Sequence, residues 1–257
     1  MRVMKAKKSL GQNFLKSKQA IRDIIKSADL SNKDLVLEIG PGRGVLTESL
    51  LESGARVVAI EKDRELLPLL VEKFAKELGE ERLLIINDDI LKFDPEDLLK
   101  YSKKYKIIAN IPYNITGAIF EKFLSALHQP ERMVLMVQNE VAKRIVARDK
   151  KESILSISVK AFGNPIYISK VPARFFSPAP KVDSAIIGIF EISRHNFKNK
   201  DEENSFFKVV KAGFAHKRKV LIKNLESVMQ KVEIHELFSK LEISHNTRAE
   251  DLSLIKW

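Results

Sequence analysis

Short apolar runs alternate with stretches of helical periodicity from residue 20 to about residue 192. This alternation is typical of a parallel sheet that is covered by helices on both faces. The runs that predict strands are residues 35–40, 56–61, 83–87, 106–110 and 133–138. The pattern therefore predicts an α/β fold.

Two further apolar runs, residues 166–171 and 184–192, follow without a good helix between them. The Pro-rich segment 172–180 separates them, so we expect a hairpin-like pair that closes the edge of the sheet, with at least one strand antiparallel. A seven-stranded sheet that ends in this way differs from that of a dinucleotide-binding dehydrogenase, whose sixth strand usually remains parallel.

The composition changes after Ile192, where residues 194–204 are polar and lack periodicity. Apolar residues then recur at helical spacing, as in Phe206, Phe207, Val210 and Phe214. We therefore predict a large domain over residues 1–193, a linker over 194–204 and a small all-helical domain over 205–257.

The chain has 257 residues, no cysteine and five scattered histidines. These features exclude disulfides, thiolate zinc sites and a cysteine nucleophile, and they give no metal signature. No stretch approaches membrane-spanning length. We expect a soluble, cytoplasmic protein that needs no metal.

A formal net charge of +11 favours a polyanionic partner, because the excess is clustered. Residues 1–18 carry six basic residues and no acid, and a second basic stretch spans residues 208–223. Enrichment in lysine can also serve solubility alone. The candidate contacts to a phosphate backbone are Lys7, Lys8, Lys217, Arg218 and Lys219.

A glycine-rich loop, residues 38–44, follows the first expected strand and precedes a helix. Glycines such as Gly40 and Gly42 let the backbone approach a ligand closely. Glu61 ends the second strand, where a carboxylate can accept both hydroxyls of a ribose. These features fit an adenosine-containing cofactor, either a nicotinamide dinucleotide or S-adenosylmethionine, and a purely structural turn is the alternative.

The third expected strand leads into Asp89 and Ile90, and the fourth ends at Asn110. Loops at the carboxyl ends of parallel strands converge, so Gly40, Glu61, Asp89 and Asn110 should line one crevice. A helix cap is the commoner role for any single Asp. The convergence of four positions favours a ligand site.

The tetrad Asn110-Ile111-Pro112-Tyr113 suits the exocyclic amine of a nucleobase. Asn110 offers a side-chain carbonyl, Pro112 keeps Ile111 extended so that its backbone carbonyl can turn toward a ligand, and Tyr113 offers a ring for stacking. Two acceptors favour the pyramidal, nucleophilic amine that exists near the transition state. An ordinary proline turn is the alternative.

Together these residues resemble the class I methyltransferases of the ribosomal RNA adenine dimethylase group. The resemblance covers nearly the whole chain. The chain departs from the group at residues 151–158, where the usual Tyr-Gly-Arg-Leu-Ser is absent, so no role of that arginine carries over. The matching parts are residues 7–15, 38–44, 110–113, 176–184, 214–224 and 248–253, with Glu61 and Asp89.

The resemblance implies a Rossmann-like, seven-stranded, mostly parallel sheet with an antiparallel edge strand, and it implies roles for individual residues. Tyr113 and Phe176 would sandwich the target adenine, and the prolines that flank Phe176 favour a rigid, presented ring over a core aromatic. Asn110 would lie between cofactor and substrate. The S-adenosylmethionine contacts would be Asn13 and Leu15 from the N-terminal segment, Gly40 under the methionine portion, Glu61 at the ribose and Asp89 at the adenine amine, together with Gly42, Ile90 and Asn110.

The implied activity is dimethylation of two adjacent adenosines in a 3′-terminal hairpin of small-subunit (16S) ribosomal RNA, by a monomer that acts on the pre-30S particle during ribosome biogenesis. Three alternatives stay open at this point. They are a large-subunit adenine methylase of the macrolide-resistance type, a non-catalytic ribosome-assembly or transcription factor, and a nicotinamide-dependent oxidoreductase. The last leaves the tetrad and the basic clusters unexplained.

Overall fold

The computed structural model describes residues 6–7 and 10–257 and divides the chain into two compact units. The sheet unit comprises Met1–Ala142 and Asn164–Ile192, and the helical unit comprises Lys143–Gly163 and Ser193–Trp257. The backbone therefore passes between the two units three times. The predicted boundary near residue 193 coincides with the last of these passages only.

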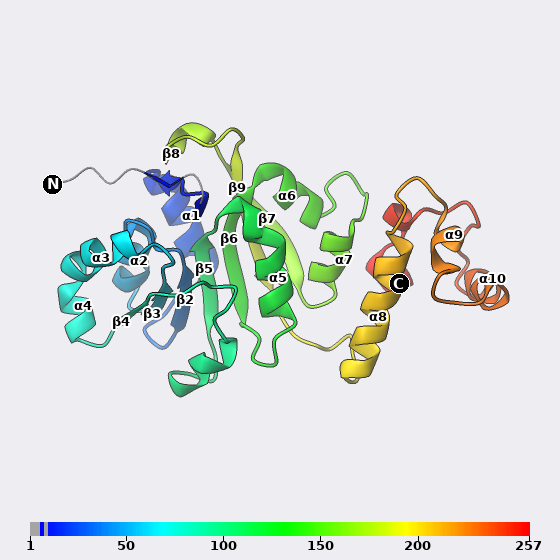
Figure 1. Cartoon of the computed structure of the whole chain (residues 1–257), viewed down its shortest axis with the longest axis horizontal. Coiled ribbons are helices and arrows are strands. Elements are labelled where there is room, and N and C mark those ends of the chain that lie inside the picture. The colour runs from blue at the N-terminus through cyan, green and yellow to red at the C-terminus, as the bar shows by residue number, and fades with distance from the viewer. Residues whose placement is uncertain (1–5, 8–9) are drawn as a thin grey trace. The chain divides into compact units, whose positions relative to one another are not determined.

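A seven-stranded sheet in the order β4-β3-β2-β5-β6-β9-β7 forms the centre of the sheet unit (Figure 1). Parallel pairing joins β4, β3, β2, β5 and β6, whereas β9 runs antiparallel to both β6 and β7. The predicted fold class is confirmed, and the reversed strand β9 lies one position inside the edge strand β7. The strands are β2 (Leu35–Ile39), β3 (Arg56–Ile60), β4 (Leu83–Ile86), β5 (Lys106–Asn110), β6 (Arg132–Gln138), β7 (Asn164–Val171) and β9 (Ser184–Phe190).

Helices lie on both faces of this sheet, which explains why its central strands are continuous apolar runs (Figure 1). All five residues of β2 are buried. Helix α1 begins at a cap, because Ser17 accepts a hydrogen bond from the Ala20 amide. The helices of the sheet unit are α1 (Lys18–Ala28), α2 (Val45–Glu52), α3 (Leu67–Lys73), α4 (Ala75–Gly79) and α5 (Thr116–Leu124), and α6 (Asn139–Ile145) contains the first passage to the helical unit.

A second, two-stranded sheet joins the N-terminal segment to the Pro-rich connection. Strand β1 (Phe14–Leu15) pairs antiparallel with β8 (Phe176–Ser177), and Leu15 lies opposite Phe176. The sequence did not predict this sheet, because strands of two residues carry no readable periodicity. The pairing brings the N-terminal segment to the part of the fold that carries the ligand loops.

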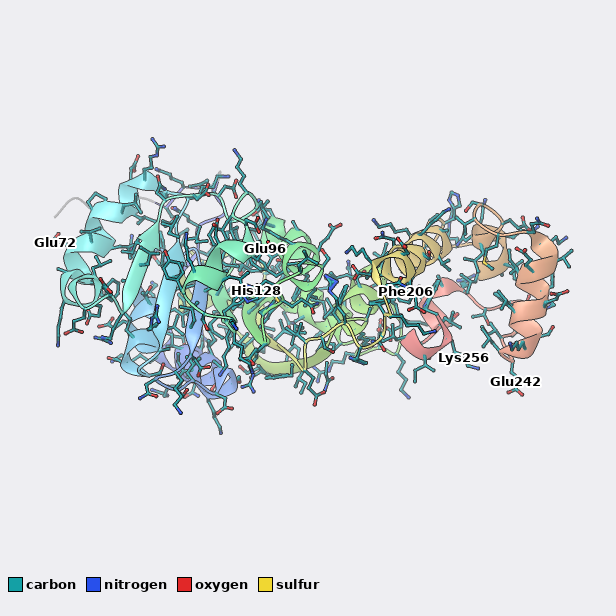
Figure 2. The ribbon with its side chains drawn as sticks, turned by 90° about the horizontal axis from the view of Figure 1, so that it is seen from below. Glu72, Glu96, His128, Phe206, Glu242 and Lys256 are labelled. Atoms are coloured by element: carbon teal, nitrogen blue, oxygen red, sulfur yellow. The ribbon has the colours of Figure 1, made fainter. Side chains whose placement is uncertain are left out.

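The helical unit contains α7 (Ile154–Lys160), α8 (Lys200–Gly213), α9 (Leu221–Leu225) and α10 (Lys231–Lys240). Segment 143–163, which the sequence placed in the large domain, belongs to this unit. Its Phe162 ring stacks on Phe207 of α8 with centroids 5.7 Å apart. The neighbouring Phe206, which Figure 2 labels on α8, lies edge-on to Phe207. Aromatic packing therefore explains why the inserted segment groups with the C-terminal helices.

The predicted linker is anchored within the helical unit. Helix α8 already begins at Lys200, capped by Asn199, and the Ser193 amide donates to the Phe162 carbonyl. Glu203 is almost fully buried and forms ion pairs with Arg194 at 2.6 Å and Lys200 at 2.5 Å. Because a buried carboxylate that loses its partners is strongly destabilising, the pair with Arg194 holds the preceding segment against α8, while the pair with Lys200 lies within the first turn of the helix. In residues 6–7 and 10–257, no helix is long and apolar enough to cross a membrane.

Candidate functional site

A cavity lies at the carboxyl ends of the parallel strands, where the sequence predicted one crevice. Its lining combines the glycine-rich loop, the ends of β3 and β5, the loop after β4 and the N-terminal segment. Phe176 is not in the lining. The predicted site residues that line the cavity are Asn13, Leu15, Gly40, Gly42, Glu61, Asp89, Ile90, Asn110, Ile111, Pro112 and Tyr113.

The glycine-rich loop bends away from β2 through left-handed backbone conformations. Gly42 has φ of +60° and Gly44 has φ of +71°, a region that side chains with a Cβ rarely adopt. A Cβ on Gly44 would come within 2.5 Å of Phe74, and one on Gly42 within 3.2 Å of the Phe14 ring. The glycines therefore let this loop pass closely between Phe74 and the N-terminal segment.

Glu61 directly follows β3 and is held by the backbone of two other residues. Its Oε2 accepts from the Gly42 amide at 3.0 Å, and its Oε1 accepts from the Asp63 amide at 2.8 Å. Burial raises the pKa of the carboxyl above its usual value, and these two bonds oppose that rise. Each oxygen keeps a further lone-pair direction, which suits two neighbouring ribose hydroxyls.

Asp89 follows β4 and is paired with Lys62. Its Oδ2 lies 2.8 Å from the Lys62 ammonium, and its Oδ1 accepts from the Leu91 amide at 3.0 Å. The hydrogen bond from Lys62 is the main reason why the pKa of Asp89 lies below its usual value. An ionised carboxylate at this end of the cavity can accept a hydrogen bond from an aromatic amine.

Asn110 ends β5 and is oriented by the N-terminal segment. Its Nδ2 donates to the backbone carbonyl of Asn13 at 3.1 Å. This bond uses one of the two amide hydrogens and orients the side chain, whose acceptor is Oδ1. The acceptor role of Asn110 toward a substrate amine stays a prediction.

Tyr113 begins the 3₁₀ turn Tyr113–Ile115, and its hydroxyl lies 2.6 Å from the Ser184 hydroxyl at the start of β9. Ser184 is fully buried, so this contact anchors the hydroxyl end of the Tyr113 ring in the protein interior. Burial raises the pKa of Tyr113 above its usual value. Sequence reasoning missed Ser184, whose one signal was its place at the start of an expected strand after the Pro-rich segment.

Phe176 does not have the presented ring that the sequence predicted. Its side chain is 3% exposed and belongs to the core cluster that includes Leu15 and Ile21. The reason is the unpredicted pairing of β8 with β1, which covers the ring. In this conformation Tyr113 alone of the two aromatic residues lines the cavity.

The predicted RNA contacts fall in two places. Lys7 forms ion pairs with Asp63 at 2.6 Å and Glu65 at 3.0 Å, so its charge is used within the sheet unit. Lys8 lies outside the described residues. Lys217, Arg218 and Lys219 are exposed on the loop between α8 and α9, although Lys217 approaches Glu250 at 3.9 Å.

Glu38 is a buried carboxyl of the cavity wall that the sequence did not single out. It is 1% exposed and lines the cavity at the end of β2. Burial raises its pKa from 4.5 to about 8. Among the described residues, its Oε2 has no hydrogen-bond partner. Glu38 is therefore protonated at neutral pH unless a ligand adds positive charge.

No group of three or more His, Asp or Glu side chains in the described chain could hold a metal ion. The residues present suit an adenosine-containing cofactor with a charged methionine portion: a ribose carboxylate, an acidic group for an aromatic amine, and an open glycine loop. This donor set includes Asp89 and the tetrad, which a nicotinamide site does not require.

Three kinds of comparison find relatives of this chain. The model of the family "Ribosomal RNA adenine dimethylase" matches residues 3–257. The Ribosomal RNA small subunit methyltransferase A of Dehalococcoides mccartyi is 43% identical over 256 residues, covering 99% of this chain and 87% of the relative.

Two solved structures share the fold over nearly the whole chain. The 23S rRNA methyltransferase ErmE gives a TM-score of 0.78 at 25% identity and covers 95% of this chain and 96% of its own. A dimethyladenosine transferase from Plasmodium falciparum gives a TM-score of 0.78 at 25% identity and covers 95% of both chains. With its cavity, its tetrad and a family match that extends over both units, this chain belongs to the ribosomal RNA adenine dimethylase family.

Proposed function

We propose that this chain dimethylates two adjacent adenosines in a 3′-terminal hairpin of small-subunit ribosomal RNA, using S-adenosylmethionine as methyl donor. The observation that carries the proposal is the position of Asn110, which is fixed by Asn13 at the edge of a cavity that suits the donor. Membership of the family supports the methyl-transfer chemistry.

The donor, when bound, supplies a methyl group that is already activated by its sulfonium. The protein therefore has to position the amine and stabilise charge that develops on it. The Oδ1 of Asn110 and the backbone carbonyl of Ile111 accept the two amine hydrogens, and Tyr113 stacks on the base. The nitrogen–carbon bond forms as the carbon–sulfur bond breaks, and the amine then releases one proton to water.

Glu61 holds the ribose, Asp89 binds the adenine amine of the donor, and Asn13, Leu15, Gly40, Gly42 and Ile90 complete its contacts in this proposal. The target adenine must leave its base stack, since a duplex hides the amine in a base pair. Phe176 can serve as a second stacking face only if β1 moves away from it, because it is buried in the present conformation.

The choice of the small subunit is supported by sequence. The solved structures of a 23S rRNA methyltransferase and of a dimethyladenosine transferase resemble this chain equally, with TM-scores of 0.78. Relatives whose name specifies the small subunit reach 43% identity, against 25% for ErmE. The exposed cluster Lys217, Arg218 and Lys219 supplies charge for a phosphate backbone.

We further propose that the chain works as a monomer on the pre-30S particle, in the cytoplasm, and without a metal. The net charge of +11 suits association with a ribosomal particle, and a direct displacement on a sulfonium needs no Lewis acid. The intact donor cavity supports the proposal against a non-catalytic assembly factor, which would not need one.

The test is methylation of purified ribosomal subunits that lack the modification, with donor carrying a labelled methyl group. We expect label in the small subunit and dimethyladenosine after digestion to nucleosides. The Asn110→Ala variant is the matched negative control. Label in the large subunit alone would show that the macrolide-resistance alternative is correct, and absence of both label and donor binding would favour the non-catalytic alternative.

A further inference from the structure

Residues 10–16, which we call the strap, run across the cavity from one ligand loop to another. The Asn13 carbonyl accepts from Asn110, and the Phe14 ring lies against Gly42. Leu15 pairs with Phe176, and the Lys16 amide donates to the Phe175 carbonyl at 2.8 Å. The strap therefore contacts the donor loop, the tetrad and β8 together.

Asp63 fastens the start of the strap through its side chain. Its Oδ1 lies 2.6 Å from the Lys7 ammonium, and its Oδ2 accepts from the Gln12 side-chain amide at 2.8 Å. Lys7 and Gln12 are themselves joined, because the Lys7 backbone amide donates to the side-chain oxygen Oε1 of Gln12 at 2.8 Å. These three bonds close a ring that ties the strap to the loop after β3.

The surroundings of Asp63 make these bonds effective. The residue is 5% exposed, and both of its oxygens accept charged or polar donors. Burial alone would raise the pKa of Asp63, but the hydrogen bonds from Lys7 and Gln12 hold it below its usual value. A buried, charge-assisted hydrogen bond is stronger than an exposed ion pair such as Lys7 with Glu65, whose carboxylate is 70% exposed.

Asp63 also contacts Glu61 through its backbone amide. Its amide donates to Oε1 of Glu61 at 2.8 Å, so the same residue orients the ribose carboxylate and the strap. A change at the Asp63 side chain can therefore loosen the strap while the backbone bond to Glu61 remains. This separation makes the contribution of the strap measurable.

We propose that Asp63 is a positioning residue that fastens the strap over the cofactor cavity, so that the affinity for cofactor depends on the Lys7–Asp63 pair. The identity of the cofactor rests on the proposed function, but the fastening does not. The charge of Lys7 then serves the strap and not RNA, which departs from the role that the sequence predicted for this lysine.

The first test measures the affinity for S-adenosylhomocysteine by titration calorimetry. Asp63→Asn keeps the shape and an acceptor for the Glu65 amide, and Lys7→Met keeps the apolar stem of the lysine. Each variant should weaken binding by about tenfold, as expected for partial loss of one charge-assisted hydrogen bond. The double variant should lose no more than the stronger single variant, because both changes remove one interaction.

Two matched variants complete the design. Glu65→Gln removes only the exposed partner of Lys7 and should bind within twofold of the wild type. Lys7→Arg retains the charge and should restore most of the affinity that Lys7→Met loses. Wild-type affinity in both Asp63→Asn and Lys7→Met, or losses that add in the double variant, would overturn the pairwise role.

A second readout does not need the cofactor. Hydrogen exchange at the amides of residues 14–16 should be faster in Asp63→Asn and Lys7→Met than in the wild type, while exchange in the central strands stays unchanged. Unchanged exchange at the strap would refute the fastening. Faster exchange in a protein that binds no S-adenosylhomocysteine would instead support the fastening and count against the proposed function.

Discussion

The side-chain amide of Asn110 donates to the backbone carbonyl of Asn13 at 3.1 Å, across 97 residues of sequence. This bond joins the last residue of β5 to the N-terminal segment. It orients the Asn110 amide, because one of its two N–H groups is held by the Asn13 carbonyl. The acceptor geometry of the tetrad therefore depends on a contact that is distant in the chain.

Replacement of Asn110 by Ala should lower kcat by a factor of roughly 10² to 10³, by analogy with the loss of one group that stabilises a transition state. Single-turnover methylation of small subunits would measure the change. Affinity for S-adenosylhomocysteine should fall much less, which separates chemistry from cofactor binding. A variant with normal turnover would show that Asn110 does not act on the amine.

Tyr113→Phe and Ser184→Ala should each lower kcat/KM for RNA about fivefold, the effect of losing one buried hydrogen bond worth about 1 kcal/mol. The double variant should resemble either single variant, since both remove the same 2.6 Å contact. Tyr105→Phe is the matched control, because the Tyr105 hydroxyl binds the His128 carbonyl and does not line the cavity. Additive losses would mean that Ser184 does not act through Tyr113.

Glu38→Gln should change how the free energy of unfolding depends on pH. The pKa of Glu38 is about 8 in the folded chain and near 4.5 when unfolded, so the folded state binds the extra proton between these values. Wild-type stability therefore falls as pH rises through this window, and a neutral Gln avoids the fall.

Urea unfolding of the cofactor-free protein at several pH values between 5 and 8.5 would measure this difference. The variant should gain on the wild type by up to about 1.4 kcal/mol for each pH unit inside the window. Above about pH 8 the difference should become constant. Parallel pH profiles would show that Glu38 is ionised in the folded protein.

Replacement of Lys217, Arg218 and Lys219 by Gln should weaken RNA binding and flatten its salt dependence. If all three contact phosphates, the slope of log K against log salt should decrease by about 2 to 3. The charge-retaining variant Lys217→Arg with Lys219→Arg should keep the wild-type slope. An unchanged slope in the Gln variant would remove this cluster from the RNA interface.

The sequence predicted the central sheet well, because β2, β5 and β6 are apolar runs that depend only on local composition and burial. It also predicted which loops would meet, since parallel strands present their carboxyl ends at one edge. The environment of Phe176 was not predictable in this way. It depends on a two-residue strand more than 150 residues earlier in the chain, and no local pattern reports such a pairing.

The boundary between the two units was also not predictable from local sequence patterns. Residues 143–163 precede two strands of the sheet, so their order in the chain suggested the large domain. Their packing is decided by Phe162 against Phe207, and a contact of this kind leaves no periodic signal. The polar composition of residues 194–204 predicted a linker, and no pattern in the sequence indicated that Glu203 in this stretch is buried and paired with Arg194 and Lys200.

The repeated passage of the backbone between the two units limits how the gene can be shortened. A fragment that stops at residue 193 keeps α7 but removes its contact partner α8, which leaves Phe162 without the ring of Phe207. Such a fragment would expose an apolar helix face and should aggregate during expression. Excising residues 143–163 as well would leave a gap that no short turn can close, because β6 ends beside Ser184 and β7 begins beside Phe190, at opposite ends of β9, so a new connection would have to run the whole length of the strands.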